Sequence, residues 1–533
     1  MPPSTATQRA LRVPEILHQI FEESSSGDQA RIAQVCKTWC DVAVGLIWKR
    51  IPDVHVLLCI LAPLTMKDDK VVFTRSLTRQ DWVRFDAYAG RVRELHQHRL
   101  CARPLHPDLM LELLVTRPPS ELLPRLRDLH LHTCTLDCAS LFLHTSITSL
   151  NICLKGIFPL LGPLLSSLPM KTPGLEKLSL QEDGFYSPEA DVEGFLADAI
   201  RGLPSLTSLC LPPFWLTSPI ANAAASAPAL RDLTASFTVA EEMTLAKSSE
   251  FKYLMSTSLP ADGFPSLTNL TLPMTFSRAT QVLLQGDHFN KLARFHITSP
   301  RVESPNAYGA MLAVLSACCP DLEYLSVSVI PIEPASYDPP TITFNDIKPV
   351  TRLTGLQYLH LHHPMPFQIK TEDVITIAQA LPCITTLVLN PAPSLKGASK
   401  LGVGVLSPLL SFFPDINKLG LYLNTSDKHI PSPESDEEYQ QVVMESGEFT
   451  RLAELNVGKT SISSPIQLAI YLSRVLPAHC SIEAYISSDD NHDEDDEDEE
   501  TVGDDWAEIV RLIPAFQQVR AEGSRIPSGP SIE

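Results

Sequence analysis

Apolar residues recur along most of this chain in one short pattern, Leu-x-x-Leu-x-Leu, with occasional replacement by other apolar residues. In the copy at Leu322, the anchors Leu325 and Val327 alternate with Ser326, so they face one side of a short strand. The pattern begins about every 30 residues, which is a period typical of stacked supersecondary units. Its starts are Val92, Leu126, Ile147, Leu175, Leu206, Leu230, Leu267, Leu292, Leu322, Leu356, Ile384, Ile416 and Leu452.

A helical pattern precedes many of these strands. Apolar residues at helical spacing run from Ala307 to Cys319, and Pro320 ends the helix because proline disfavours the helical conformation in the residue before it. The same order of helix, proline and strand recurs at 192–209, 373–389 and 406–421. One such pair cannot bury its own apolar face, so neighbouring pairs must stack, strands against strands and helices against helices.

These repeats resemble the leucine-rich-repeat family in its longer, helix-containing, ribonuclease-inhibitor-like variety. The resemblance covers roughly residues 90 to 486. It implies an α/β fold, a right-handed solenoid with a concave parallel sheet and convex helices, which we expect over 91–487. The Asn or Cys that the family places three residues after the last Leu occurs only as Cys134.

The first fifty residues follow a different, helical pattern. Pro14 stands in the first turn of one predicted helix, Asp28 can cap a second, and a third runs through Trp39 at apolar steps of three and four. These three helices form a module that we place at residues 11–52. About forty residues make a poor independent domain, so this module needs something to pack against.

The module resembles an F-box. It matches the family's opening Leu-Pro-x-Glu-Ile/Leu-Leu-x-x-Ile-Phe, with Val13 for the usual Leu, then Val-Cys-Lys/Arg-x-Trp and a late Trp. The resemblance implies binding to a Skp-type adaptor and, through it, to a cullin ligase, so that the chain selects the substrate of a Skp-cullin-F-box ubiquitin ligase. The implied adaptor contacts are Val13, Pro14, Ile16, Leu17, Ile20, Phe21, Val35, Cys36, Trp39 and Trp48.

A second hypothesis gives these helices a purely structural role. Repeat arrays need caps at their ends, and the module could be only a cap on a leucine-rich-repeat scaffold for protein interactions, with no link to ubiquitin. That hypothesis predicts that the apolar faces of the first fifty residues are buried against the array. We expect connecting helices over 53–90. The stretch from Asp81 to Leu95 is similar to the junction after the F-box in many fungal members of the family.

Strand alternation also selects the residues that face the concave surface. Parallel strands lie about 4.8 Å apart, so outward side chains of adjacent repeats should form one patch. Tyr and Arg are over-represented among interface hot spots, which favours this patch as the contact for an unknown protein substrate. The alternative is that polar residues merely solvate an inner face. The predicted substrate contacts are Arg294, His296, Tyr324, Tyr358, His360 and His362.

Charge and composition exclude several classes of partner. The formal net charge is -20, and a nucleic-acid partner is not expected because phosphate binding needs clustered Lys and Arg. We expect no membrane partner, because no apolar run is long enough to span a bilayer and the N-terminus lacks the apolar core of a signal peptide. The 12 scattered cysteines are typical of a reduced protein, which we expect in the cytoplasm or nucleus.

We find no enzymatic motif, neither a phosphate loop, nor a Gly-x-Ser-x-Gly elbow, nor His-Glu-x-x-His. We therefore expect no catalytic residues, no cofactor and no metal. One cluster of metal-capable side chains fits no standard zinc spacing, so a structural role is favoured for it. An enzyme that uses this cluster is a third hypothesis, and it requires bound metal. The cluster consists of His130, His132, Cys134, Cys138 and His144.

The ends of the chain are predicted from charge and periodicity. We expect disorder over 1–10, which is polar, and over the tail at 522–533. The acidic tract at 488–505 is also expected to be disordered, because its like charges repel one another and cannot pack. A helix is expected over 506–521 and should dock on the last repeat through one apolar stripe. That stripe consists of Trp506, Ile509, Val510, Ile513 and Phe516.

Overall fold

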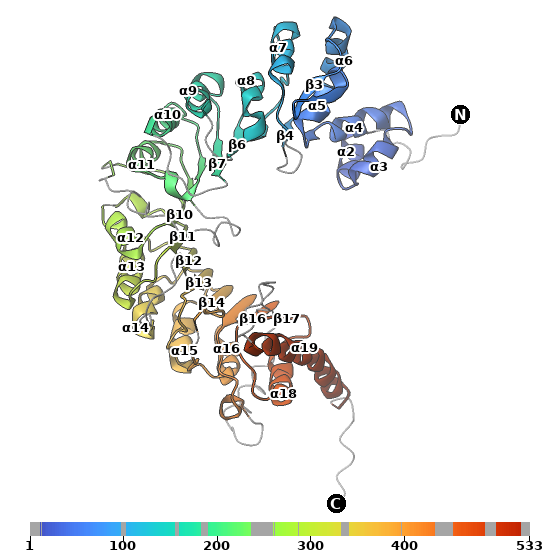
Figure 1. Ribbon diagram of the computed structural model, residues 1–533. Coiled ribbons are helices and arrows are strands. Elements are labelled where there is room, and N and C mark those ends of the chain that lie inside the picture. The colour runs from blue at the N-terminus through green and yellow to red at the C-terminus, as the bar shows by residue number, and fades with distance from the viewer. Residues whose placement is uncertain are drawn as a thin grey trace, which may run out of the picture. The chain divides into compact units, whose positions relative to one another are not determined.

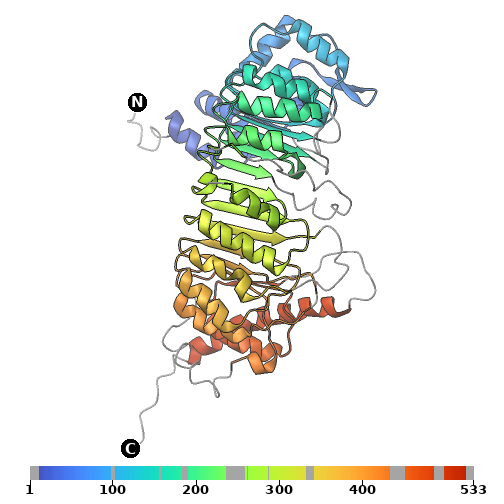
Figure 2. The ribbon, with the colours of Figure 1, turned by 90° about the vertical axis from the view of Figure 1, so that its left-hand side faces the viewer.

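The computed structural model falls into two compact units, one formed by Met1–Ala235 with Lys252–Ser266 (unit 1) and the other by Ser236–Phe251 with Leu267–Glu533 (unit 2). In each unit, parallel strands form a sheet and helices lie along one of its faces (Figures 1 and 2). The structure describes residues 11, 13–97, 103–154, 159–182, 190–235, 259–260, 262–285, 287–331, 341–395, 397–431, 451–484 and 497–523.

Unit 1 begins with three helices, α2 (Pro14–Glu22), α3 (Ser26–Ile32) and α4 (Lys37–Ile47). Pro14 occupies the first turn of α2, where its missing N–H costs no hydrogen bond. Ser25, and not Asp28 as predicted, caps α3: its hydroxyl accepts a hydrogen bond from the Asp28 backbone N–H at 3.2 Å. Asp28 instead lies inside the first turn, where a negative charge favours the helix dipole.

Residues 53–90 contain two helices and a hairpin, where we predicted helices only. Helix α5 (Val54–Leu61) and α6 (Arg79–Ala89) flank the antiparallel strands β2 (Leu64–Lys67) and β3 (Lys70–Phe73). Asp68 and Asp69 have φ of 50° and 58°, the left-handed conformation of a two-residue hairpin turn. Because this turn lacks the usual glycine, its sequence gave no hairpin signal.

The sheet of unit 1 contains parallel strands from successive repeats, in chain order. They are β1 (Arg50–Ile51), β4 (Glu94–His96), β5 (Asp128–His132), β6 (Ser149–Leu154), β7 (Lys177–Glu182), β8 (Ser208–Leu211) and β9 (Asp232–Ala235). Between them run helices α7 (Pro107–Thr116), α8 (Ala139–Phe142), α9 (Leu161–Lys171), α10 (Ala190–Arg201) and α11 (Ser218–Ala225), and the 3-10 turns η2 (Thr133–Cys138) and η3 (Pro213–Trp215).

The sheet of unit 2 has the same construction. Its strands are β10 (Asn269–Pro273), β11 (Arg294–Ser299), β12 (Tyr324–Val329), β13 (Tyr358–Leu361), β14 (Thr386–Leu389), β15 (Lys418–Leu421), β16 (Glu454–Gly458) and β17 (Ser481–Ala484). The intervening elements are α12 (Phe276–Leu283), η5 (Asp287–Phe289), α13 (Pro305–Cys318), α14 (Phe344–Ile347), η6 (Lys348–Arg352), α15 (Thr371–Ala380), η7 (Val403–Val405), α16 (Leu406–Phe412), η8 (Asp427–His429) and α18 (Pro465–Val475), and the last helix is α19 (Glu497–Gly523).

Each predicted repeat start stands two residues before a strand, as Leu322 does before β12. The anchors Leu322, Leu325 and Val327 are fully buried. Along β6, buried and half-buried residues alternate, so one face of the sheet packs under the helices and the other, which we call the open face, does not. The predicted α/β class with a parallel sheet is therefore confirmed within each unit.

The last helix begins earlier than predicted. Helix α19 starts at Glu497 and ends at Gly523, so the expectation of disorder is wrong for 497–505 and 522–523. Acidic residues at a helix N-terminus favour the helix because they complement its dipole. The remaining residues expected to be disordered, 1–10, 488–496 and 524–533, lie outside the described part of the chain. No helix among the described residues is long and apolar enough to cross a membrane.

Candidate functional site

Helix α2 has a core face, formed by two residues one turn apart. Leu17 and Phe21 are 0% and 2% exposed and pack with Ala43 and Leu46 of α4. The Phe21 ring also meets the Trp39 ring edge to face, with centroids 5.3 Å apart. These contacts form a small core that belongs to the N-terminal helices themselves.

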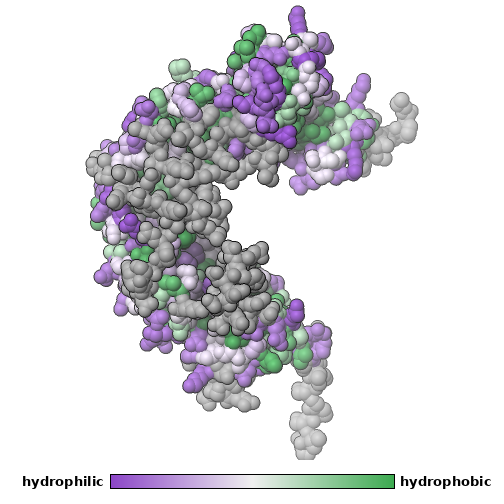
Figure 3. All heavy atoms as spheres, in the orientation of Figure 1, coloured by the Kyte–Doolittle hydropathy of each residue, from purple (hydrophilic) through white to green (hydrophobic). Residues whose placement is uncertain are grey.

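A second face of α2 is apolar and exposed. Val13, Ile16 and Ile20 are 38%, 37% and 49% exposed, and their spacing of three and four residues places them in one row. We call these three residues the α2 apolar face. Hydrophobic side chains are visible at the surface over the N-terminal helices (Figure 3). Val35, between α3 and α4, is also largely exposed.

The third face of α2 is polar and lies on the side of the helix away from the α2 apolar face. It consists of Glu15, His18, Gln19 and Glu22. With residues of α4 and with Gly90, Arg91, Arg93 and Arg125, it lines a groove of about 800 Å³. Across this groove the Arg91 guanidinium donates to the Asp41 carbonyl at 3.2 Å, while Lys49 bonds to Glu22 at 3.0 Å and lowers its pKa. The groove separates α2 from the segments around Gly90 and Arg125 of unit 1. The polar face of α2 therefore faces the rest of unit 1, and the α2 apolar face does not.

The ten predicted adaptor contacts therefore separate into groups. Leu17 and Phe21 are core residues, which corrects the prediction that they contact a partner. Trp39 is half-buried against Phe21, and its Nε1 donates to the Leu11 carbonyl at 3.1 Å. Trp48 is half-buried against the Tyr88 ring of α6, with centroids 4.6 Å apart. The residues that remain exposed are Val13, Pro14, Ile16, Ile20, Val35 and Cys36.

In unit 2, the predicted substrate contacts lie in two rows across the open face. Arg294, Tyr324 and Tyr358 are register partners on β11, β12 and β13. The Tyr324 and Tyr358 rings stack 4.0 Å apart, and the Arg294 guanidinium carbon lies 5.9 Å from the Tyr324 ring centroid. Burial, with help from Tyr358, raises the pKa of Tyr324 to about 12. The first row is thus a cation beside two stacked phenol rings.

The second row contains histidines that burial keeps neutral. His296, Ser326 and His360 are register partners, and Ser326 Oγ lies 3.3 Å from His360 Nδ1. Burial lowers the pKa of His296 and lowers that of His360 to about 4. The pKa of His362 is also lowered, again chiefly by burial. Neutral imidazoles both donate and accept hydrogen bonds, so this row can recognise polar groups without adding charge.

A cavity of about 820 Å³ lies at the C-terminal end of unit 2, and Tyr358, His360 and His362 line it. Its other wall comes from α19, through Trp506, Ala507, Val510 and Arg511, and its remaining lining comes from β14 to β17 and the segment after β14. The apolar stripe predicted for α19 is therefore only partly buried. Its buried residues are Trp506, Ile509 and Ile513, whereas Phe516 is half-buried and Val510 is 44% exposed.

Charged residues of both signs lie in and beside the cavity. Lys418 forms an ion pair with Glu454 and lies 3.7 Å from Glu483, to which Asn456 Nδ2 donates at 3.2 Å. Burial, together with the nearby Glu483 carboxylate, raises the pKa of Glu454. The cavity thus brings aromatic, charged and neutral polar groups together on one surface.

Gly458 forms part of the cavity wall and has a special conformation. Its φ is +52°, and a Cβ atom there would lie 1.9 Å from the Pro391 carbonyl oxygen. Only glycine permits both the left-handed backbone and this close approach. The wall of the cavity therefore depends on a residue that sequence periodicity does not mark.

Among the described side chains of the metal-capable residues singled out in the sequence, no three come close enough together to share one ion. His144 Nδ1 lies 3.6 Å from Glu121, and Cys138 is buried. His132 is buried as well, and the side chain of Cys134 lies outside the described part of the chain. His130 lies instead beside His96 and Asp128. Sequence reasoning missed His96, although it follows the second repeat anchor as His130 does one repeat later.

Comparison with known proteins gives one domain match. Residues 14–51 match the family model described as F-box-like. A chain of the solved structure titled "Crystal structure of Rad7 and Elc1 complex in yeast" is similar at 13% identity and a TM-score of 0.34, over 67% of this chain and 79% of that chain. No curated protein matches the chain.

Proposed function

We propose that this chain, whose residues 14–51 form an F-box-like domain, is the substrate-recognition subunit of a Skp-cullin-F-box ubiquitin ligase. The domain binds a Skp-type adaptor and, through it, a cullin ligase, while the repeats bind a protein substrate. We further propose that the repeats form a right-handed leucine-rich-repeat solenoid of the fungal F-box type. Parallel strands at a spacing of about 30 residues, with helices on one face, support this architecture.

The exposure of the α2 apolar face carries the proposal. Three apolar side chains in one row on a small helical module are unfavourable in water unless a partner covers them. Among the described residues, neither the module nor the rest of unit 1 covers them. Leu17 and Phe21 occupy the core face of α2, and the polar third face lines the groove toward the rest of unit 1. Fully burying an aliphatic side chain contributes about 1.5 to 3 kcal/mol. Because Ile16 and Ile20 are 37% and 49% exposed, covering both contributes about 1–3 kcal/mol of the roughly 8 kcal/mol of a micromolar affinity.

Co-expression with a Skp-type adaptor tests this proposal. We expect the full-length chain to co-purify with the adaptor, and the Ile16→Asp, Ile20→Asp variant to lose it. Phe21 is unsuitable for such a test because its replacement would disrupt the core. A matched control carries Ile466→Asp and Val519→Asp, two exposed apolar positions on helices of unit 2. Failure of the unmodified chain to bind would favour the scaffold alternative.

We place the protein substrate on the open face of unit 2, over the rows that contain Arg294 and His360 and into the cavity beside Lys418. The stacked tyrosines support this placement because rigid aromatic side chains lose little conformational entropy on binding. The set of ubiquitinated proteins that are trapped on the assembled ligase should change when Arg294→Ala and Tyr358→Ala are combined. Adaptor binding should stay constant in this variant. An unchanged set of trapped proteins would argue against this placement.

The alternative is a repeat scaffold without a ubiquitin link. It is favoured by the contacts that fasten the module to unit 1, namely Trp48 with Tyr88 and Arg91 with Asp41, as a cap would require. In either case we propose that the chain is not itself an enzyme and acts in the cytoplasm or nucleus. Among the described cysteines, Cys36, Cys59 and Cys383 are exposed thiols that form no disulfide, as a reducing compartment favours.

A further inference from the structure

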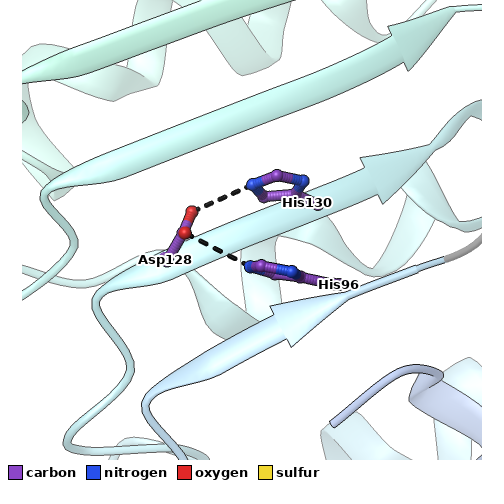
Figure 4. Close-up of side chains that lie close together, drawn as sticks. All are labelled: His96, Asp128 and His130. Atoms are coloured by element: carbon purple, nitrogen blue, oxygen red, sulfur yellow. Dashed lines mark hydrogen bonds and ion pairs between the residues drawn. The ribbon is translucent and has the colours of Figure 1, made fainter. Parts of the chain in front are cut away.

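Two histidines and one aspartate meet on the open face of unit 1 (Figure 4). His96 belongs to β4, and Asp128 and His130 belong to the neighbouring strand β5, with His96 and His130 in register. Asp128 Oδ2 lies 3.2 Å from His96 Nε2, and Asp128 Oδ1 lies 3.1 Å from His130 Nε2. The two imidazole rings stack with centroids 4.0 Å apart. Both rings thus turn their Nε2 atoms toward one carboxylate.

We propose that His96, Asp128 and His130 bind a divalent transition-metal ion such as Zn²⁺, with its fourth position open to water or to a donor from a bound partner. One potential ligand atom from each residue can be chosen so that all lie within 4.8 Å of one another. In a tetrahedral zinc site, ligand atoms lie about 3.3–3.4 Å from one another. The Asp128 oxygens already lie 3.2 and 3.1 Å from the two Nε2 atoms, so side-chain movements of about 1.5 Å or less bring all three ligands onto one ion.

The residue types select the kind of ion. Imidazole suits zinc, copper, iron and nickel, whereas magnesium and calcium prefer sites made only of oxygen atoms. Three protein ligands with one open position are typical of zinc sites that contact a further molecule. The side chains of His96, Asp128 and His130 are 27%, 30% and 35% exposed, so an ion can reach them from solvent.

The surroundings hold the three side chains in place. Strands position side chains more firmly than loops do, and all three residues lie within the hydrogen-bonded ladder of β4 and β5. Glu94 Oε2 lies 3.9 Å from His96 Nε2 and is held by Arg50 at 2.5 Å. The Glu94 carboxylate therefore places further negative charge beside the nitrogen that would bind the ion, which favours a cation there. The competing explanation is a hydrogen-bonded His-Asp-His cluster that binds no ion.

Metal titration of the full-length chain, without an affinity tag and stripped of metal with a chelator, separates these explanations. We expect calorimetry with Zn²⁺ to show a site that His96→Ala and His130→Ala each weaken at least about tenfold. Asp128→Asn, which preserves size, should weaken it as well. The control His479→Ala removes an exposed histidine that belongs to no such group among the described residues, and it should leave the affinity unchanged.

Two further readouts guard against misfolding and against binding elsewhere. Circular dichroism of each variant must match that of the unmodified chain, and Zn²⁺ should raise the melting temperature of the unmodified chain but not that of His130→Ala. Bound Co²⁺ should show d–d bands without a thiolate charge-transfer band. Absence of a zinc site, an affinity that the three variants leave unchanged, or a thiolate band showing cysteine ligands would overturn the proposal.

Discussion

The Phe21 ring of α2, in the core of the F-box-like domain, meets the half-buried Trp39 ring of α4 edge to face, with centroids 5.3 Å apart. Phe21→Ala should destabilise this domain by about 3–5 kcal/mol, because it leaves a cavity and removes the aromatic pair. Ile20→Ala, one residue earlier but exposed, should change its stability by no more than about 0.5 kcal/mol.

Hydrogen exchange over residues 14–47 of the full-length chain measures both effects, because a chain of two units has no single unfolding free energy. Exchange should accelerate strongly in the Phe21 variant and hardly at all in the Ile20 variant. Equal protection in the two variants would contradict the division of α2 into a core face and an exposed face.

The stability of unit 2 should fall in mild acid because of buried His363. Its Nδ1 accepts a hydrogen bond from the Met365 backbone N–H at 3.1 Å, and burial is the chief cause that lowers the pKa of His363 to about 4. In the unfolded state the histidine pKa is about 6.5. Between pH 4 and pH 6.5 the unfolded state therefore binds more protons at His363 than the folded state does. This contribution to stability is therefore fully present above about pH 6.5 and is lost as pH falls toward 4.

The His363 shift corresponds to a loss on the order of 2 kcal/mol between pH 7 and pH 5. His363→Asn keeps an acceptor for the Met365 N–H but does not titrate, so its unit 2 should lose less stability over that range. Denaturant unfolding followed by hydrogen exchange in unit 2 at both pH values measures the difference. The same acid sensitivity in the variant and the unmodified chain would show that His363 is not responsible.

Gly458→Ala should destabilise unit 2 by at least about 1–3 kcal/mol, because alanine is strained at a φ of +52° and its Cβ would meet the Pro391 carbonyl. The matched control is Gly355→Ala, where a Cβ would have no neighbour within 4 Å. Denaturant unfolding of both variants, read in unit 2, provides the comparison. Equal stability of the two variants would mean that the wall of the cavity tolerates a shift of the backbone.

Trp506→Ala should detach α19 from the rest of unit 2. Trp506 is buried, and its Nε1 donates to the Thr460 carbonyl at 2.8 Å, so its loss should cost about 3–5 kcal/mol locally. Limited proteolysis within 497–523 should accelerate in this variant. Val510→Ala, which changes an exposed residue of the same helix, serves as the control. A cleavage rate unaffected by the Trp506 change would contradict the anchoring role of this side chain.

Local pattern was sufficient to predict the strands, because each repeat carries its own anchors, as Leu322 and Leu325 do. It failed where a second element decides the outcome. Leu17 and Ile16 belong to adjacent apolar stripes of one helix, and only the packing of α4 determines which stripe is buried. The cavity likewise needs α19 beside β17, and the pairing of His96 with His130 needs the register of two strands from successive repeats.

The central claim is that the α2 apolar face binds a Skp-type adaptor. Titration of the purified full-length chain with purified adaptor tests it most directly, with hydrogen exchange on α2 recorded in the same samples. We predict that binding slows exchange over 14–22 and that Ile16→Asp with Ile20→Asp weakens the affinity at least about a hundredfold, while the Ile466→Asp, Val519→Asp control binds normally. An equal affinity in all three proteins, or no protection of α2 in the complex, would contradict the account.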